Sequence, residues 1–182
     1  MKKDQHPVWN VYDFLRTIRL NVKYNQHLLD YFSKLSMSFD LSLAIIAPSS
    51  SIATFGFWGT DEGKIVWQVL IAITAIIAFI KPFLRLNDKI KYHERLALGY
   101  DILYDEIISL KNKISNSQQY TGKHILEFEE IEKKRRILKK KYPNKYKDNK
   151  SLISKLCEEI DKELPNNIFF VPTDVVKKES DK

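Results

Sequence analysis

The sequence predicts an all-α membrane protein: a two-transmembrane helical hairpin with an amphipathic N-terminal helix, a long cytosolic helix and a small helical, basic C-terminal region. Three observations support this fold class. Residues 41–60 and 65–80 contain no charged side chain. Apolar residues on either side of these runs recur every three or four positions, as on one face of a helix. The 182 residues include only five Gly and six Pro, so few positions are available to break helices.

The second uncharged run, residues 65–80, is apolar enough to cross a bilayer. Ten of its sixteen side chains are Ile, Val, Leu or Phe. Each favours insertion by about 0.3–0.6 kcal/mol at a helix centre, or about 3–6 kcal/mol together. Sixteen residues at about 1.5 Å each cover only about 24 Å of a hydrocarbon layer about 30 Å thick. We therefore extend the predicted span to Leu84, with the Lys81 ammonium snorkelling to the headgroups.

The first uncharged run, residues 41–60, is a weaker span. Asp40 is positioned to cap its start, and Pro48 and three serines interrupt its middle, so this side needs a protein neighbour or water. The short GTDEGK segment between the runs predicts a hairpin, and the alternative is a hairpin buried inside a soluble bundle. Several Lys and Arg residues flank the hairpin on both sides, whereas its turn has one lysine, which predicts that both termini are cytosolic.

These patterns divide the chain into four segments. We expect residues 1–36 to form an amphipathic cytosolic or interfacial helix and residues 37–84 the two-transmembrane hairpin. Residues 85–115 have apolar positions at alternating steps of four and three and are expected to form a long cytosolic stalk helix. His93 lies on that apolar stripe, which predicts a packed polar core residue. Residues 116–182 form the basic C-terminal region.

This C-terminal region carries the positive charge of the chain. Between residues 111 and 150, thirteen Lys and Arg against five Asp and Glu give +8, whereas the whole chain carries +7. The pattern predicts a charged helix that ends before Pro143 and a short helix from Ser151 to Leu164 with Ser151 as its cap. The IFFV segment that follows is expected to be either an edge strand or a docking peptide.

No catalytic or metal-binding constellation is recognisable in the sequence. Cys157 is the only cysteine, which excludes an intramolecular disulfide and a CxxC site. The four histidines fall in no HExxH or related motif, and GxGxxG and GxxxxGK[ST] loops are missing. We therefore expect a protein that is not an enzyme, with no cofactor and no metal.

A run of cations in the charged helix is the strongest candidate ligand site. The charges cover more than one helix face and are followed by tyrosine rings that can stack, a combination that suits phosphate-rich ligands. The candidate ligand-binding residues are Lys133, Lys134, Arg135, Arg136, Lys139, Lys140 and Tyr142. The alternative is a solvated helix near anionic headgroups that reinforces the topology.

Polar residues around the first uncharged run form a second candidate site. Ser50 and Thr54 are four residues apart and Ser51 lies beside them, so one side of a helix here carries hydroxyl groups. In a symmetric oligomer this side could line water, and with Asp40 these three are the candidate pore-lining residues. The alternative is that small and hydroxyl residues only allow membrane helices to pack closely.

One stretch after the predicted hairpin points to a known family. The segment HERLALGYDILYDEI contains Tyr100, Leu103, Glu106 and Ile107. Together with the hairpin and the amphipathic helix before it, this segment resembles the SLATT-type two-transmembrane effectors of bacterial anti-phage conflict systems. The Hailong-type membrane effectors are a close variant. The resemblance is mostly architectural and covers roughly residues 8–115, so the basic C-terminal segment is a departure from the plain SLATT architecture.

The resemblance implies a pore- or channel-forming effector in the bacterial inner membrane. It implies a multi-pass homo-oligomer, with a tetramer as one arrangement, in contact with the lipid bilayer. A nucleotide or oligonucleotide signal from a partner nucleotidyltransferase would gate the pore, and the basic helix would sense it. The alternative is a membrane-anchored scaffold or adaptor that recruits a cytosolic partner without conducting ions.

Overall fold

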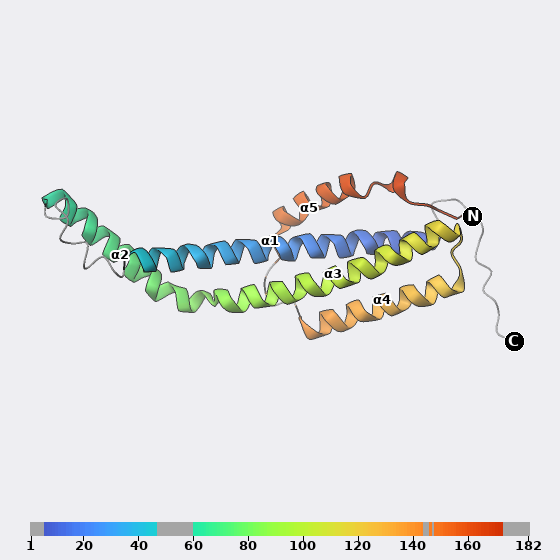
Figure 1. The fold of residues 1–182 in the computed structure, drawn as a ribbon, viewed down its shortest axis with the longest axis horizontal. Coiled ribbons are helices and arrows are strands. Elements are labelled where there is room, and N and C mark those ends of the chain that lie inside the picture. The colour runs from blue at the N-terminus through green and yellow to red at the C-terminus, as the bar shows by residue number, and fades with distance from the viewer. Residues whose placement is uncertain (1–5, 47–59, 144–145, 147, 173–182) are drawn as a thin grey trace. The chain divides into compact units, whose positions relative to one another are not determined.

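The computed structural model describes residues 6–46, 60–143, 146 and 148–172, and these residues are all-α (Figure 1). In these ranges there are five α-helices and one 3-10 turn, and no strand. The elements are α1 (Val8–Ile46), α2 (Asp61–Leu84), α3 (Leu86–Ser117), α4 (Gly122–Lys141), α5 (Lys150–Glu163) and the 3-10 turn η5 (Asn166–Ile168). The predicted all-α class is confirmed for this part of the chain.

The chain divides into two compact units. Residues 1–27 and 93–182 form unit 1, and residues 28–92 form unit 2. Unit 1 therefore contains the first half of α1, most of α3, and all of α4 and α5. Unit 2 contains the second half of α1, the whole of α2 and the start of α3.

The core of unit 1 is built from apolar faces of α1 and α3. Both faces follow the three- and four-residue spacing that places side chains on one side of a helix. The fully buried residues of the α1 face are Val8, Val11, Tyr12, Leu15, Ile18 and Val22. The buried residues of the α3 face are Leu96, Tyr100, Leu103, Ile107, Leu110 and Ile114.

One polar pair lies inside this core. His93 is 3% exposed, and its Nδ1 lies 3.0 Å from Oδ1 of the buried Asn25. A buried polar group costs little when it has a hydrogen-bond partner, so the pair is compatible with the surrounding apolar side chains. The prediction that His93 is a packed polar core residue is confirmed.

α4 packs against both long helices of unit 1. The rings of Phe14 on α1 and Phe128 on α4 meet edge to face, with centroids 5.3 Å apart. A Cβ added at Gly99 of α3 would come within 2.6 Å of Cδ1 of Leu138, so α3 and α4 approach closely at this level. The Tyr142 amide donates to the Leu138 carbonyl at 2.9 Å and ends the helix before Pro143, as the sequence predicts.

α5 and the segment after it cover the N-terminal part of α1. Asn149, not the predicted Ser151, is the N-cap of α5: its side chain accepts a hydrogen bond from the Leu152 amide at 3.1 Å. The backbone amide of Asn149 also donates to the Tyr24 hydroxyl of α1 at 3.1 Å. Asn is as favourable an N-cap residue as Ser, and the contact with Tyr24 adds a tertiary hydrogen bond at this position.

The IFFV segment docks on α1 and is not a strand. The Phe169 ring stacks on the Tyr12 ring with centroids 4.3 Å apart, and the Tyr12 hydroxyl donates to the Phe170 carbonyl. Burial raises the pKa of Tyr12 to about 12, so the hydroxyl stays protonated and able to donate. Of the two expectations for this segment, the docking peptide is confirmed.

Unit 2 contains the most apolar helix of the chain. α2 begins after Thr60, whose side chain accepts a hydrogen bond from the Gly63 amide at 3.1 Å, and ends at Leu84, the predicted end of the second span. Arg85 follows in the left-handed conformation with φ 45°, which separates α2 from α3. In the described residues, α2 is the one helix long and apolar enough to span a membrane.

α1 does not end near residue 36, where the sequence segmentation places a boundary, but continues to Ile46. No Gly or Pro interrupts residues 37–46, and Ser38 and Ser42 donate to the carbonyls four residues earlier at 2.9 and 2.8 Å. Asp40 therefore lies inside a helix and caps no helix start. Most of the first predicted span falls on residues 47–59, outside the described residues, so the second crossing of the hairpin stays a prediction.

The α3 core face provides a stability prediction. Leu110 is 0% exposed and Leu126 on α4 is 68% exposed. We expect Leu110→Ala to destabilise the protein by about 2–5 kcal/mol, since it removes buried methyl groups and leaves a cavity. Leu126→Ala, the same change at a solvated position, is expected to stay within about 0.5 kcal/mol. Thermal unfolding of the purified protein, followed by circular dichroism, measures both, and equal destabilisation would contradict this assignment of the core.

Candidate functional site

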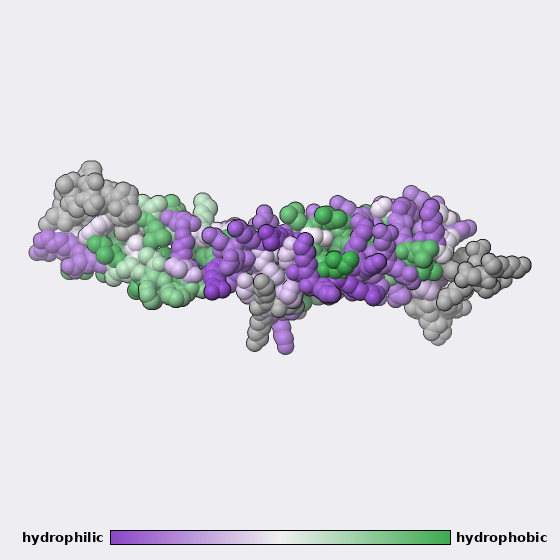
Figure 2. Space-filling model, turned by 90° about the horizontal axis from the view of Figure 1, so that it is seen from below, coloured by the Kyte–Doolittle hydropathy of each residue, from purple (hydrophilic) through white to green (hydrophobic). Residues whose placement is uncertain are grey.

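The surface of α2 is the first candidate functional feature. Nine large hydrophobic residues between Ile65 and Phe83 are exposed, with Phe79 at 71% and Phe83 at 74%. They cover most of the helix circumference, whereas Trp67, Leu70 and Thr74 follow a half-buried stripe on the remaining side. Figure 2 shows apolar residues gathered over this helix. Soluble proteins rarely expose so large a contiguous apolar surface, because water contact with it is unfavourable.

The length of α2 fits a bilayer. Its 24 residues correspond to about 36 Å at about 1.5 Å per residue, against a hydrocarbon layer of about 30 Å. Charged residues occur only near its ends: Asp61, Glu62 and Lys64 in the first turn and Lys81 in the last. This distribution is the one expected of a helix whose middle lies in lipid and whose ends reach the headgroups.

Of the four candidate pore-lining residues, the described part of the chain includes one. Asp40 is exposed on α1, and its carboxylate pairs with the ammonium of Lys81 on α2. Ser50, Ser51 and Thr54 lie outside the described residues. Asp40 therefore neutralises the cation at the end of α2, a role that the sequence alone did not suggest.

The basic helix α4 is the second candidate site, and its cations differ in what they contact. Lys133, Lys139 and Lys140 are exposed, and no ion pair in the described residues involves them. Arg136 pairs with Glu132 at 3.2 Å, one turn earlier on the same helix. These three lysines therefore contribute to the positive potential that this helix offers to solvent, together with the exposed Lys123 and Lys141.

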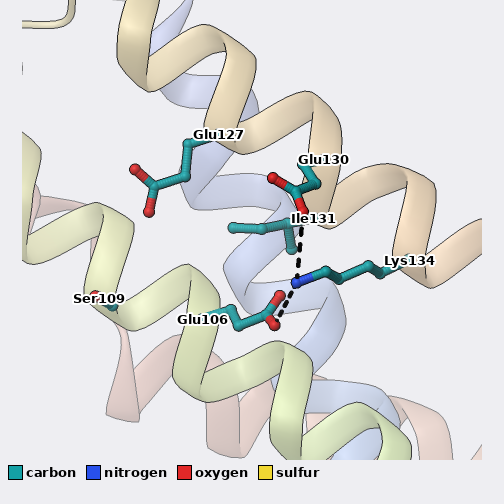
Figure 3. Close-up of a pocket in the computed structure, with 6 residues that line it drawn as sticks. All are labelled: Glu106, Ser109, Glu127, Glu130, Ile131 and Lys134. Carbon is teal, nitrogen blue, oxygen red and sulfur yellow. Dashed lines mark hydrogen bonds and ion pairs between the residues drawn. The ribbon is translucent and has the colours of Figure 1, made fainter.

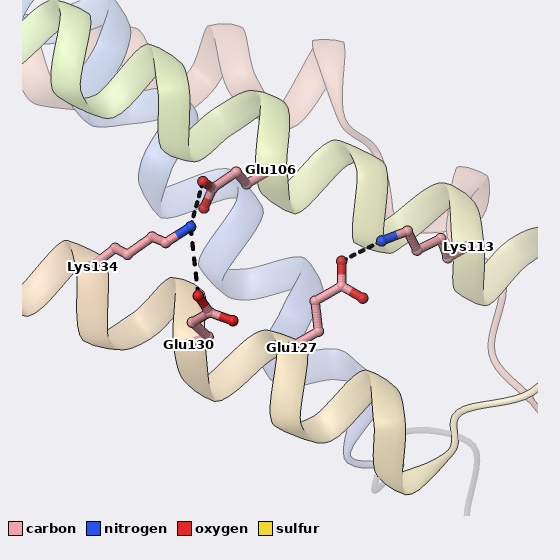
Figure 4. A network of polar contacts seen from close by, with 5 residues as sticks. All are labelled: Glu106, Lys113, Glu127, Glu130 and Lys134. Carbon is pink, nitrogen blue, oxygen red and sulfur yellow. Dashed lines mark hydrogen bonds and ion pairs between the residues drawn. The ribbon is translucent and has the colours of Figure 1, made fainter.

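Lys134 points toward α3, into a group of carboxylates. Its Nζ lies 2.6 Å from Oε1 of Glu106 on α3 and 3.9 Å from Oε1 of Glu130 on α4 (Figure 4). The hydrogen bond with Glu106 raises the pKa of Lys134 above its ordinary value, so its charge is retained well above neutral pH. A second bridge joins the same helices, because Lys113 Nζ lies 2.5 Å from Glu127 Oε1.

These groups line a shallow pocket between α3 and α4. The pocket holds about 270 Å³ and is shown in Figure 3. Its lining residues are Glu106, Ser109, Glu127, Glu130, Ile131 and Lys134. Three carboxylates and one ammonium repel a phosphate more than they attract it. An anionic ligand is therefore expected on the outer face of α4 and not in this pocket.

Arg135 and Tyr142, two further candidate ligand residues, are half-buried. The Arg135 guanidinium lies 4.7 Å from the centroid of the Phe14 ring, a distance at which a cation is attracted to an aromatic face. The Lys141 ammonium lies 5.7 Å from the Tyr142 ring in the same way. Arg135 thus holds α4 against α1, and less of its charge is available to a ligand.

A second set of cations, on α1, faces acidic residues of α5. Arg16 bonds to Asp161 at 2.7 Å, and Arg19 and Lys23 converge on Glu163 at 2.6 and 2.7 Å. The Arg19 guanidinium also lies 4.8 Å from the Tyr104 ring centroid on α3. The sequence analysis missed this site, although the three cations recur at helical spacing and Glu159 and Glu163 are four residues apart on α5.

These contacts shift the titration of Glu163. Burial opposes ionisation of its carboxyl, but hydrogen bonds and charge attraction from Lys23 and Arg19 outweigh burial and hold the pKa below the ordinary value of 4.5. In the described residues no group of three or more His, Cys, Asp or Glu is placed to hold a metal ion.

The Glu163 network predicts a pH dependence. A carboxyl with a lowered native pKa contributes stability that is present above pH 4.5 and is lost as the pH falls through the native pKa. We expect Glu163→Gln to flatten the fall in stability below pH 4.5. Glu158→Gln, an exposed α5 position outside the ion pairs, should leave this dependence unchanged. Urea unfolding measured from pH 7 to pH 3 tests this, and parallel curves for wild type and Glu163→Gln would refute it.

Comparison with known proteins adds no family to these observations. No protein-family model, curated protein or solved structure matches this chain. The resemblance of residues 8–115 to SLATT-type effectors therefore stays a hypothesis that rests on helix order and on the segment around Tyr100.

Proposed function

We propose that this chain is a pore- or channel-forming membrane effector of a bacterial anti-phage defence system. In this proposal several copies assemble in the inner membrane, with both termini in the cytosol, and residues 37–84 cross the membrane as a hairpin. The observation that carries the proposal is α2, a helix of 24 residues whose large apolar side chains are exposed. Such a surface is stable only when lipid or another apolar surface covers it.

The gate of the proposed pore responds to a cytosolic nucleotide or oligonucleotide made by a partner nucleotidyltransferase. The exposed Lys133, Lys139 and Lys140 of α4 support this part of the proposal, since ammonium groups at an accessible helix face attract phosphates. The SLATT-like order of helices supports the effector class. Asp40, Ser50, Ser51 and Thr54 remain the proposed pore-lining residues, with Asp40 held near Lys81.

A second function, a membrane-anchored scaffold or adaptor, is favoured by a different observation. Many cations of unit 1 are bound within the unit, as the Lys134–Glu106 and Arg19–Glu163 pairs illustrate. A folded helical unit that pairs part of its charge internally presents a defined surface to a protein partner. The two functions differ in one measurable property, because only a pore conducts ions.

Ion flux through reconstituted protein tests the pore. We expect wild-type protein in liposomes to dissipate a potassium gradient, in a manner that an added oligonucleotide changes. Ile73 lies at the middle of α2 and is 47% exposed. Ile73→Lys should abolish flux and membrane retention, since a lysine at the helix centre costs about 2.5–3.5 kcal/mol. That cost is comparable to the whole insertion energy of the span.

Ile73→Leu is the matched control for this experiment. It keeps the apolar character of the position and should retain both membrane association and flux. A wild-type protein that inserts stably and leaves the gradient intact, with and without oligonucleotide, would contradict the pore and favour the scaffold. A wild-type protein that stays monodisperse without detergent and fractionates with the cytosol would contradict both.

The differing environments of the α4 lysines predict a graded effect on ligand binding. We expect the triple change Lys133→Ala, Lys139→Ala and Lys140→Ala to weaken binding of a single-stranded oligonucleotide and to lower its salt slope by roughly 2, at about 0.7 per phosphate contact. The double change Lys134→Ala and Arg136→Ala should matter less, since both cations already pair with glutamates. Filter binding at low and high salt measures this, and unchanged binding of the triple variant would reject the sensing helix.

A further inference from the structure

Unit 1 exposes a small apolar patch across α3 and α4. Leu98, Ile102 and Ile137 are 60%, 62% and 57% exposed, and they are three of the six large hydrophobic residues that unit 1 exposes in its described part. Isolated exposed apolar residues are ordinary, but a cluster of three large aliphatic side chains is a typical feature of a docking surface.

The helix contacts place these three side chains next to one another. Gly99 meets Leu138 and Glu106 meets Lys134, so the segment of α3 from 98 to 106 lies alongside the segment of α4 from 134 to 138. On α3, Ile102 lies next to Gly99 and Glu106 around the helix, on the side away from the buried Leu103. On α4, Ile137 lies next to Lys134 and Leu138, on the side away from the buried Ile131. Both therefore lie on the solvent side of the same seam, with Leu98 one turn from Ile102.

Charges of opposite sign border the patch on its two sides. On the outer face of α3, Asp101 and Asp105 are exposed beside Leu98 and Ile102. Lys133 and Lys140 are exposed on the outer face of α4 beside Ile137, seven residues apart and thus on one helix face. At the level of these residues the order across the surface is acidic, apolar, basic, and the exposed Glu129 and Glu130 lie about one turn before Lys133 on α4. Arg95 is the one exposed cation on α3 between residues 93 and 105, and it lies toward the end of the patch.

A surface with this order is complementary to a second copy of itself. When one copy is turned by 180° about an axis parallel to the helices, its acidic side lies over the basic side of the other copy and the apolar patches meet. Rotation about an axis across the helices would instead place acidic residues on acidic residues. Charge thus selects one of the two ways in which the face can pair with itself.

We propose that this α3–α4 face, defined by Leu98, Ile102, Ile137, Asp101, Asp105, Lys133 and Lys140, is a two-fold interface between two copies of the chain. This interface adds detail to the proposed function, and it rests on the proposal that several copies of the chain assemble in the membrane. In the pair the two α3 helices run in the same direction, so the segments that precede α3 in both chains leave the interface at the same end. Two chains that cross one membrane with the same topology require this parallel arrangement.

Charge-reversed variants of the full chain test the interface. One variant carries Asp101→Lys and Asp105→Lys, so both sides of its face are basic. The other carries Lys133→Glu and Lys140→Glu, so both sides are acidic. We expect each variant alone to associate at least tenfold more weakly than wild type and an equimolar mixture to recover wild-type association, because each basic side then meets an acidic side. Masses are measured by light scattering in detergent.

The apolar patch is tested separately. Ile102→Asp and Ile137→Asp should each weaken association at least tenfold, since a carboxylate at the centre of an interface is left unpaired. Ile168→Asp is the control, because Ile168 is 46% exposed on η5, outside this face. Circular dichroism verifies that all variants are folded. Wild-type mass in both charge-reversed variants, or a wild-type protein that is monomeric, would overturn the interface, whereas failure of the pore is read independently from potassium flux.

Discussion

The exposed apolar surface of α2 is the constraint on which the other features of this protein depend. A helix that is hydrophobic around most of its circumference is only partly buried by one partner helix, because that partner covers only a stripe. The half-buried side at Trp67, Leu70 and Thr74 is such a stripe, and the opposite side remains exposed. Lipid can cover a helix from all sides, and the length and end charges of α2 also match a bilayer.

Ion pairs within unit 1 use part of the charge that lies outside α2. The net charge of +8 between residues 111 and 150, taken from the sequence alone, suggests an open basic surface. In the fold, Lys134 and Lys113 bridge to glutamates across the α3–α4 seam, and Arg135 lies on the Phe14 ring. Exposed ion pairs of this kind contribute little stability each, but they determine which cations remain available. The net charge summed over the sequence therefore overestimates the positive charge that is accessible to a ligand.

Much of the fold could be predicted from the sequence, because local patterns determine it. The end of α2 at Leu84 follows from the apolar run and bilayer thickness, and the end of α4 follows from Pro143. Long-range contacts contribute to the features that were missed. Asn149 caps α5 where Tyr24 holds its backbone, and Asp161 and Glu163 find Arg16 and Arg19 more than 140 residues earlier. A sequence shows which charges exist, but pairing depends on which helices become neighbours.

The α3–α4 face shows the same limit for the candidate site. Ile102 and Ile137 are ordinary apolar positions in their own helices, and only the contact of Gly99 with Leu138 brings them to one surface.

Lys133 and Lys140 belong both to this face and to the proposed ligand site. A phosphate-rich ligand on these lysines competes with the carboxylates of a second copy, since both are anions at the same cations. By thermodynamic linkage, ligand binding lowers the affinity between two copies by a certain factor, and pairing lowers the affinity for the ligand by the same factor. A signal could therefore alter assembly without changing the interior of unit 1.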